Sequence, residues 1–274
     1  MKGVSFGQYY PSNSLLHKLD PRTKVILAVL YIVCTFLCKN ALGFAVLTAS
    51  ALLLILISKI PMKIIVRSLR PILIIIAFTS AINIFMTNGE QLLTPESWGI
   101  RIYAEGVWNA VFMVLRISVL IIGTGLFLTY TTTPIALTDA LEYLLSPLKK
   151  IKVPVHDFAM MMTIALRFIP TLSEETEKIM NAQKARGADF TTGSLVKRAK
   201  ALVPILVPLF VSAFNRAFDL ASAMECRCYH GGEGRTRLNV LHFHAVDYVA
   251  MLLVVTFGVG LFFINRLGIG FTMR

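Results

Sequence analysis

Charged side chains are scarce in this chain: Asp, Glu, Lys and Arg make up 15% of the 274 residues, and hydrophobic residues make up 56%. A soluble domain usually carries about a quarter charged residues, so the composition excludes an ordinary soluble protein. The mean hydropathy of +0.70 instead predicts a multi-span membrane protein. Acidic residues are fewer than basic ones, 15 against 27. The basic residues flank apolar segments without forming an aromatic-interleaved patch, so we expect no nucleic-acid partner.

Cysteine is also rare, with four residues in two close pairs. Cys34 and Cys38 lie one helical turn apart in an apolar segment, and Cys226 and Cys228 flank an arginine. Neither pair has the spacing of a zinc site completed by a second pair. We therefore expect reduced, non-catalytic thiols and no metal site, although His230 lies close to the second pair.

Motifs for phosphate binding and for secretion are missing as well. The chain has no G-x-x-x-x-G-K-[ST] loop, and the glycine-rich stretch at 231–234 lacks the Lys–Ser/Thr ending and a preceding strand. Residues 1–22 are polar, and no small-residue cleavage site follows an isolated apolar run. We therefore expect no cleavable signal peptide, and a first apolar segment that is retained as a membrane helix.

Five apolar segments are long enough to cross a membrane if flanking residues contribute. They cover about 23–38, 41–58, 71–86, 106–129 and 246–264. A sixth apolar segment, Leu202–Phe214, contains Pro204 and Pro208 and is followed by Arg216 and Asp219. Because a charged residue at the membrane centre costs about 2.5–3.5 kcal/mol, we expect this sixth segment to be a buried or interfacial helix.

The basic residues predict which side of the membrane each loop occupies, since Lys and Arg concentrate in cytoplasmic loops. Four precede the first span or lie at its start (Lys2, Lys18, Arg22, Lys24), and four lie in the loop between spans two and three (Lys59, Lys63, Arg67, Arg70). The opposite loops hold only Lys39 and Arg101. We therefore expect a cytoplasmic N-terminus, a cytoplasmic region 130–242 and an external C-terminus.

The predicted fold is all-α, a polytopic membrane protein with about five transmembrane helices and a cytoplasmic domain of three helices, two of them long. The predicted boundaries place the N-terminal lead and four spans in 1–130, the cytoplasmic helices in 131–241, and the last span with the C-terminus in 242–274. We expect the cytoplasmic helices near Thr138–Lys149, Val155–Arg186 and Ser194–Arg227. The second would be roughly 48 Å long, with a kink at Pro170.

Each long cytoplasmic helix ends in an arginine with a helix breaker just beyond it. The first ends in Ala185-Arg186-Gly187, and the second in Cys226-Arg227-Cys228 before Gly231 and Gly232. A cation is favoured at the negative end of the helix dipole, and a guanidinium pairs well with a partner's carboxylates. One such arginine is explained equally well as a helix cap, but the repetition favours two equivalent contacts to an acidic partner.

The same two helices carry apolar faces that need cover. Adaptable, methionine-containing surfaces suit a partner that moves or is exchanged. The alternative is that these faces pack on each other and on lipid. The candidate contact residues are Phe158, Met161, Met162, Ala165, Leu206 and Phe210.

Within the predicted spans, Arg116 is a functional candidate by default, because an ionisable residue there is costly. A backbone carbonyl or a polar groove would satisfy it. His242 and His244 precede the last span, but residues two apart do not share a helix face, so we expect no metal site there.

Several motifs together resemble those of the transmembrane T component of energy-coupling factor transporters. They are Tyr9-Tyr10-Pro11, the stretch from Leu16 to Lys24 (LHKLDPRTK), Arg67-x-x-Arg70-Pro71, Ala185-Arg186-Gly187 and the stretch from Ser222 to Tyr229 (SAMECRCY). The similarity covers nearly the whole chain, and the two arginine motifs are its most specific part.

The resemblance implies a coupling scaffold in the prokaryotic cell membrane. In that family the T component joins two ATP-binding-cassette ATPases to a small membrane subunit that captures a vitamin or metal ion, and the Arg of each X-Arg-X motif docks on one ATPase. Carried over, Ala185, Arg186 and Gly187 would bind one ATPase, and Cys226, Arg227 and Cys228 the other. The apolar faces would hold the capturing subunit, and ATP would be bound by the partners, with no cofactor on this chain. The cysteines depart from the commoner Ala-Arg-Gly. The loss of glycine puts in question how closely the backbone of the second motif can approach the ATPase.

Two other functional classes make different demands on the sequence. A polytopic membrane enzyme would use Asp139, Glu142, Asp157 or the His242/His244 pair, but the spans hold no carboxylates or histidines paired at helical spacing. A permease binding its own substrate would show polar clusters inside spans or an inverted repeat. Away from the ends of the spans, the only candidates for such a polar cluster are Asn83, Arg116 and a few hydroxyls. The sequence therefore favours a non-catalytic coupling scaffold.

Overall fold

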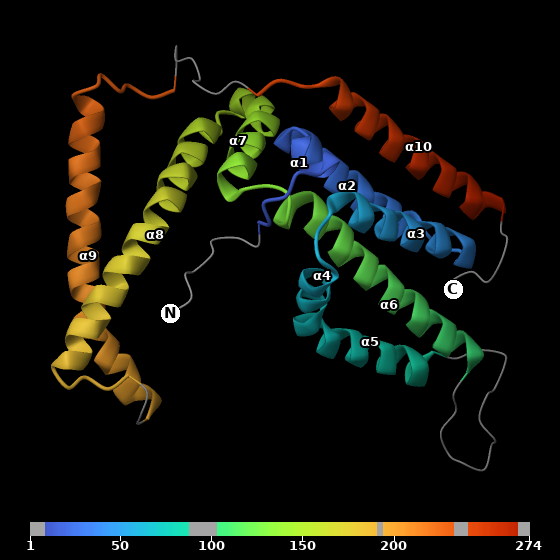
Figure 1. The fold of residues 1–274 in the computed structure, drawn as a ribbon, viewed down its shortest axis with the longest axis horizontal. Helices are drawn as coiled ribbons and strands as arrows, with labels where there is room; N and C mark the ends of the chain where they lie inside the picture. The colour runs from blue at the N-terminus through green and yellow to red at the C-terminus, as the bar shows by residue number, and fades with distance from the viewer. Residues whose placement is uncertain (1–8, 88–102, 191–193, 233–240, 268–274) are drawn as a thin grey trace. The chain divides into compact units, whose positions relative to one another are not determined.

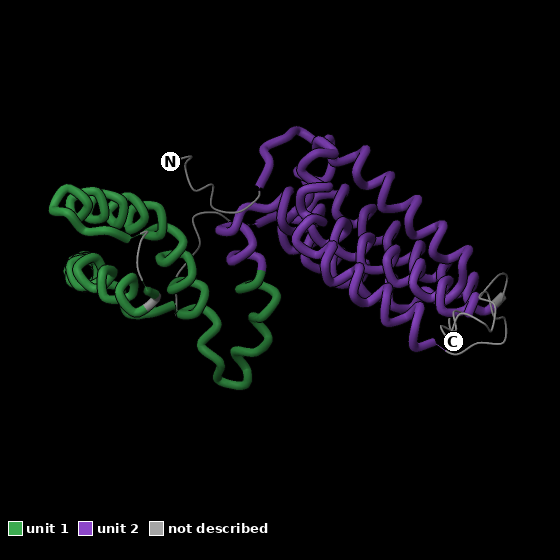
Figure 2. The backbone as a smooth tube through the Cα atoms, turned by 90° about the horizontal axis from the view of Figure 1, so that it is seen from below, with its two compact units in different colours: residues 1–6, 141–240 green, residues 7–140, 241–274 purple. Residues whose placement is uncertain are grey.

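A computed structural model describes residues 9–87, 103–190, 194–232 and 241–267, and over these residues the chain forms helices joined by loops, without β-strands. Figure 1 shows the helices in chain order. The chain divides into two compact units, coloured separately in Figure 2: unit 1 comprises 1–6 and 141–240, and unit 2 comprises 7–140 and 241–274. The all-α fold expected from the composition is confirmed.

Unit 2 is a helical bundle built around α2. Its elements are α1 (Leu15–Lys18), α2 (Pro21–Leu37), α3 (Ala41–Ser58), α4 (Met62–Leu69), the 3-10 turn η1 (Arg70–Ile72), α5 (Leu73–Met86), α6 (Ala104–Thr124), the π-helical turn η3 (Gly125–Thr129), most of α7 (Pro134–Leu144) and α10 (Ala245–Leu267). Helix α2 packs on α6, η3 and α10, and α5 packs along α6. The core that results is apolar, with Leu27, Tyr31, Leu47 and Phe127 almost completely buried.

Local sequence signals explain where α2 begins and how closely it packs. Asp20 is its N-cap and accepts a hydrogen bond from the backbone N–H of Arg22 (2.8 Å), with Pro21 at the first helical position. An Asp N-cap followed by Pro is a usual sequence signal for the start of a helix. Further along, Gly123 of α6 faces the ring of Tyr31, and a Cβ atom at that glycine would overlap the ring. The glycine therefore permits the close approach of α2 and α6.

A buried carboxylate joins the start of α10 to the start of α2. Asp247 is completely buried and accepts hydrogen bonds from the backbone N–H groups of Asp20 and His244, both at 2.8 Å. The guanidinium of Arg22 donates to the carbonyl of Leu241 (3.0 Å). These bonds satisfy orphan N–H groups at two helix starts, which is the usual use of an acidic side chain there.

Five helices are long and apolar enough to cross a membrane, within the residues that the structure describes: Ala41–Ser58, Met62–Met86, Ala104–Thr129, Val196–Glu225 and Ala245–Arg266. Four of them include predicted spans. The fifth lies in α9, whose apolar segment was expected to be an interfacial or buried helix. The predicted first span, 23–38, corresponds to α2, which is not among these five helices. Helix α2 has 17 residues and contributes to the core of unit 2. The chain is thus a polytopic helical membrane protein.

The segment between spans two and three differs from expectation. The sequence predicted a basic loop at 59–70, but Met62–Leu69 is helix α4, joined to α5 through η1. Ile65 is the reason: it is buried against Ile60, Leu126 and Tyr130, which gives the short helix an apolar anchor. An eight-residue helix needs such packing, because short helices are marginal by themselves.

Unit 1 contains the end of α7, the 3-10 segment η4 (Ser146–Ile151), and two helices of 31 residues each, α8 (Val155–Ala185) and α9 (Leu195–Glu225). Ser194 caps α9 by accepting from the N–H of Lys197. Prolines lie inside both helices, Pro170 in α8 and Pro204 and Pro208 in α9. Both long helices therefore lie where the sequence predicts them. The functional boundaries 1–130, 131–241 and 242–274 stay a prediction.

Candidate partner-binding site

The C-terminal end of α8 is capped by backbone hydrogen bonds, and Arg186 is its C-cap residue. Gly187 has a φ of +88°, and its N–H donates to the carbonyl of Lys184 (3.0 Å). The N–H of Ala188 donates to the carbonyl of Gln183 (3.0 Å). This is the bond pattern of a Schellman cap, in which a left-handed residue ends the helix and turns the chain away. Arg186 directly precedes that residue.

The C-terminal end of α9 has the same backbone construction. Cys228 has a φ of +55°, and its N–H donates to the carbonyl of Glu225 (2.9 Å). The N–H of Tyr229 donates to the carbonyl of Met224 (3.1 Å). Arg227 therefore stands in the same position as Arg186, directly before a left-handed residue. Cys228 thus has the left-handed backbone conformation that Gly187 has at the end of α8.

Both arginine side chains are exposed and available to a partner. Neither Arg186 nor Arg227 makes a side-chain hydrogen bond or ion pair with any described residue. The flanking Ala185, Gly187, Cys226 and Cys228 are exposed as well. Each guanidinium thus lies at the negative end of a long helix dipole, where a cation is favoured and can meet an external carboxylate.

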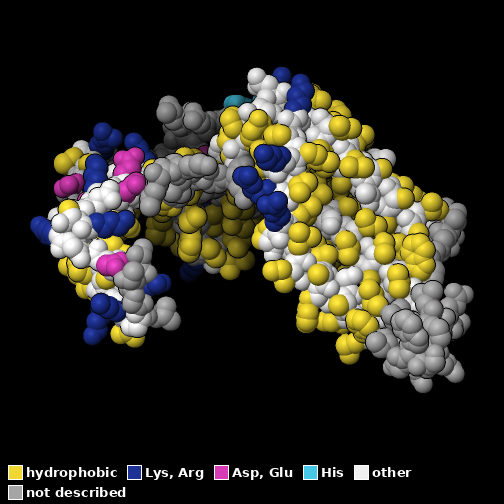
Figure 3. Space-filling view, turned by 60° about the horizontal axis from the view of Figure 1, so that its bottom comes forward, with side chains coloured by type: hydrophobic (Ala, Val, Ile, Leu, Met, Phe, Trp, Pro, Cys, Tyr) yellow, Lys and Arg dark blue, Asp and Glu magenta, His cyan; other side chains and the backbone are white. Residues whose placement is uncertain are grey.

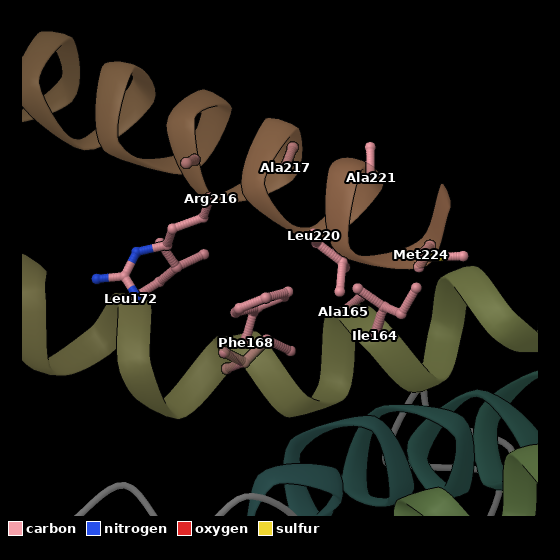
Figure 4. A pocket seen from close by; sticks show the side chains of 11 residues that line it. Ile164, Ala165, Phe168, Leu172, Arg216, Ala217, Leu220, Ala221 and Met224 are labelled. Carbon is pink, nitrogen blue, oxygen red and sulfur yellow. The ribbon is translucent and has the colours of Figure 1, made fainter. Parts of the chain in front are cut away.

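Helices α8 and α9 are antiparallel, so the two arginines lie at opposite ends of the pair (Figure 1). In the groove between the helices, Leu172 lies near Arg216, and Ile164 lies near Met224, so that residue numbers rise along one helix as they fall along the other (Figure 4). A helix of 31 residues is roughly 46 Å long. Two ends so far apart suit two separate partner surfaces, one at each end.

A polar cluster joins the two helices. Glu175 of α8 accepts hydrogen bonds from the hydroxyl of Ser212 (2.6 Å) and from the guanidinium of Arg216 (2.8 Å), both on α9. The Ser212 hydrogen bond first, and then the nearby charge of Arg216, lower the pKa of the Glu175 carboxyl below its usual value of 4.5. From the sequence, Arg216 counted only as a cost of membrane insertion. Its partner, on another helix, could not be found from periodicity.

Beside this cluster, the two helices leave an apolar groove of about 420 Å³ (Figure 4). Its α9 side includes three small side chains, Ala213, Ala217 and Ala221, together with the larger Arg216, Leu220 and Met224. Its α8 wall includes Ala165 and Phe168. Ala165, one of the predicted contact residues, is thus part of a surface shared by both helices.

The other predicted contact residues lie on exposed parts of the two helices. Phe158, Met161 and Met162 on α8 are half to two-thirds exposed, as are Leu206 and Phe210 on α9. Phe210 packs against Phe214 with ring centroids 4.6 Å apart, so the α9 face is an aromatic strip. These side chains do not cover one another completely. The expectation that they contact a partner stays a prediction.

At the start of α8, His156 contacts both α7 and the chain beyond α9. His156 pairs through Nδ1 with the carboxylate of Glu142 on α7 (2.9 Å). Gly232 lies against the His156 ring so closely that a Cβ atom would overlap it. The segment after the Arg227 motif therefore packs on the opposite end of α8, which favours the antiparallel arrangement.

Most of the residues that other functions would need have structural contacts or are exposed. Arg116 donates to the carbonyl of Cys38 (2.9 Å) and lies over the ring of Phe44, so a carbonyl is among its partners. Asp157, His242 and His244 are exposed. Among the described residues, no three His, Cys, Asp or Glu side chains lie together as metal ligands would. Arg101, in the predicted external loop, and Lys2 lie outside the described residues.

Comparisons with known proteins place this architecture in a family. The family model CbiQ, described as cobalt transport protein, matches residues 12–238. A protein of Ruminiclostridium cellulolyticum named energy-coupling factor transporter transmembrane protein EcfT is 52% identical over 258 residues, covering 94% of this chain and 95% of that protein. Proteins of the same name from Thermosediminibacter oceani (49% over 260 residues, 95% and 97% covered) and Bacillus subtilis (45% over 265 residues, 97% and 99% covered) are also similar.

The candidate membrane-spanning helices and these relatives together define a membrane component of a transporter. The chain belongs to the CbiQ family, and its expected resemblance to transmembrane components of energy-coupling factor transporters is confirmed by these relatives. It is a multi-pass prokaryotic membrane protein with a role in transport.

Proposed function

We propose that this chain is the scaffold that transmits ATP-driven movement from two ATPase subunits to a separate, substrate-capturing membrane subunit. The observation that carries the proposal is the matched pair of helix ends. Arg186 and Arg227 stand in equivalent backbone positions, exposed and unpaired among the described residues, at opposite ends of an antiparallel pair. The names of the relatives, which refer to energy-coupling factor transporters, support the same role.

In this proposal the helix pair works as a lever. Each ATPase binds one arginine, and closure of the ATPase dimer on ATP moves the two ends. The Glu175–Arg216 ion pair and the Ser212 hydrogen bond hold the helices together where they cross, so that a movement at one end changes the angle of the whole pair. The exposed apolar faces of α8 and α9 transmit that change to the capturing subunit, which takes up a vitamin or another micronutrient.

No residue of this chain has to make or break a bond in this role. ATP is bound and hydrolysed by the partners, and the substrate is bound by the capturing subunit. The work of this chain is mechanical and electrostatic: it presents two cations and an apolar surface in a defined geometry.

The test is co-purification from membranes through a tag on this chain. The parent should bring down two ATPase subunits and a small membrane protein. The double variant Arg186→Glu with Arg227→Glu should lose the ATPases, because losing one partner of a buried interfacial charge pair costs about 2–5 kcal/mol and a reversed charge adds repulsion. Lys184→Glu is the matched control, since Lys184 is an exposed cation two residues before Arg186.

The control variant should retain the ATPases. Full retention by the double variant would show that the arginines are only helix caps. A parent chain that purifies alone and turns over a substrate would contradict the scaffold and favour the membrane enzyme.

A further inference from the structure

Helix α4 presents a stripe of cations that the coupling function does not use. Lys63, Arg67 and Arg70 recur at helical spacing away from the buried Ile65, and Lys59 shortly precedes the helix. All four side chains are exposed. None of them makes a hydrogen bond or ion pair with another residue that the structure describes. The stripe is therefore fully available to an external anion.

The chain itself offers the stripe no counter-charge nearby in the sequence. No Asp or Glu occurs between Asp20 and Glu90. In Figure 3, Lys and Arg side chains gather in one part of unit 2, and hydrophobic side chains cover much of the rest. Four unneutralised cations within residues 59–70 repel one another, so they are best explained by an anionic surface that the isolated chain lacks.

The position of α4 identifies that surface. The helix follows α3, which is a candidate membrane span, and it opens the next candidate, Met62–Met86. Figure 1 shows that α4 does not continue the direction of α5. Pro71 stands at the bend, where it interrupts the helical hydrogen bonding. Connectivity thus places α4 at the membrane–water boundary, on the side that the basic residues predict to be cytoplasmic.

The apolar residues of α4 fit the same location. Met62 and Val66 are more than half exposed, although they flank an anchored helix face. An amphipathic helix with cations on its polar face and exposed apolar side chains beside them lies at the level of lipid headgroups. Clusters of four or more Lys and Arg next to a membrane span bind anionic headgroups, whose phosphates they reach.

We propose that α4 is a binding site for anionic phospholipid headgroups, with Lys63, Arg67 and Arg70 as its phosphate contacts and Lys59 beside them. The site holds the junction of α3, α4 and α5 at the cytoplasmic surface of the bilayer. Because Ile65 packs on Leu126 of η3 and on Tyr130 directly after η3, a headgroup held by α4 also steadies η3.

Native mass spectrometry of the full-length chain in detergent tests the proposal. Phosphatidylglycerol and phosphatidylcholine with identical acyl chains are titrated separately, so that only the headgroup differs. The parent should bind phosphatidylglycerol several-fold more tightly, with a preference that falls as salt is raised. Each cation replaced in Lys63→Gln, Arg67→Gln and Arg70→Gln should lower that affinity about fivefold at low salt.

Two variants make the result specific. Lys149→Gln with Lys150→Gln and Lys152→Gln removes three exposed cations from unit 1 and should leave the preference intact. Equal loss in this control would show that net charge, and not α4, attracts the lipid, which overturns the proposal. Lys63→Arg with Arg67→Lys and Arg70→Lys keeps the charges and should keep the preference.

Two further outcomes would also overturn the proposal. One is a parent chain that binds both lipids equally. The other is a triple Gln variant that keeps its lipid preference but loses the ATPases on co-purification, because the stripe would then bind protein. Helix content by circular dichroism shows that each variant is folded.

Discussion

At the scale of single residues, Cys228 does the work of a glycine. It takes a left-handed backbone conformation that closes the end of α9, as Gly187 closes α8. Residues other than Gly, Asn and Asp rarely adopt this conformation. In it the Cβ atom comes too close to the following carbonyl oxygen, which costs about 1–2 kcal/mol per residue. The strain lies directly beside Arg227, and the cap holds that arginine in position.

Replacing Cys228 by Gly should therefore stabilise the protein. We expect Cys228→Gly to raise the free energy of unfolding by up to about 1 kcal/mol, because the strain is relieved while the cap is kept. Cys226→Gly is the control: Cys226 has a φ of −59°, so glycine there should destabilise by about 0.5–1 kcal/mol. Thermal unfolding in detergent measures both. Shifts of the same sign would contradict the role given to Cys228.

Also at the residue scale, Glu175 makes the stability of the α8–α9 pair depend on pH. Its carboxyl has a pKa lowered below 4.5 in the folded protein, so the charged form is the stabilising one. That contribution is fully present at pH above the unfolded value, and it is lost as the pH falls through the lower folded value. The contact that holds the helices together at their crossing should thus weaken only under acid conditions.

We expect the stability advantage of the parent over Glu175→Gln to be present near neutral pH and to shrink as the pH is lowered below about 4.5. Thermal unfolding measured across that range would show it. Ser212→Ala should narrow the difference, because the Ser212 hydroxyl is the largest cause of the lowered pKa. A difference that does not change with pH would mean that Glu175 acts through packing alone.

At the scale of helices, the approach of α6 to α2 depends on one glycine. Gly123→Ala should destabilise the bundle by about 1–3 kcal/mol, because the new Cβ would overlap the ring of Tyr31 in a filled core. Gly260 lies inside α10, where an added Cβ would meet no atom within 4 Å, so Gly260→Ala should cost nothing and is the control. Thermal unfolding in detergent compares the two variants. Equal losses would show that helix flexibility, and not the Tyr31 contact, is at stake.

Helix ends were the best-predicted elements, because their signals are local. Asp20 with Pro21, Ser194 and Gly187 mark the helix boundaries that the structure has. The loop expected at 59–70 was wrong, since Ile65 finds its packing partners in η3 and Tyr130, far along the chain. No local pattern could have shown that contact.

At the scale of the whole molecule, the sequence predicted the two arginine motifs but not their geometry. That the motifs are repeated is evident from Arg186 and Arg227 alone. That the helices are antiparallel depends on pairings such as Glu175 with Arg216 and on the side chains that line the groove, which are contacts between distant residues. The candidate site was therefore predictable as a set of residues, while its division into two separate ends was not.

In the proposed scaffold, these two helix ends bind two ATPases independently. The measurement is the number of ATPase subunits retained per tagged chain, by native mass spectrometry of the nucleotide-free complex, in Arg186→Glu and in Arg227→Glu separately. Each single variant should lose one ATPase and keep the other. Loss of both subunits in either variant, or of none in both, would contradict independent binding.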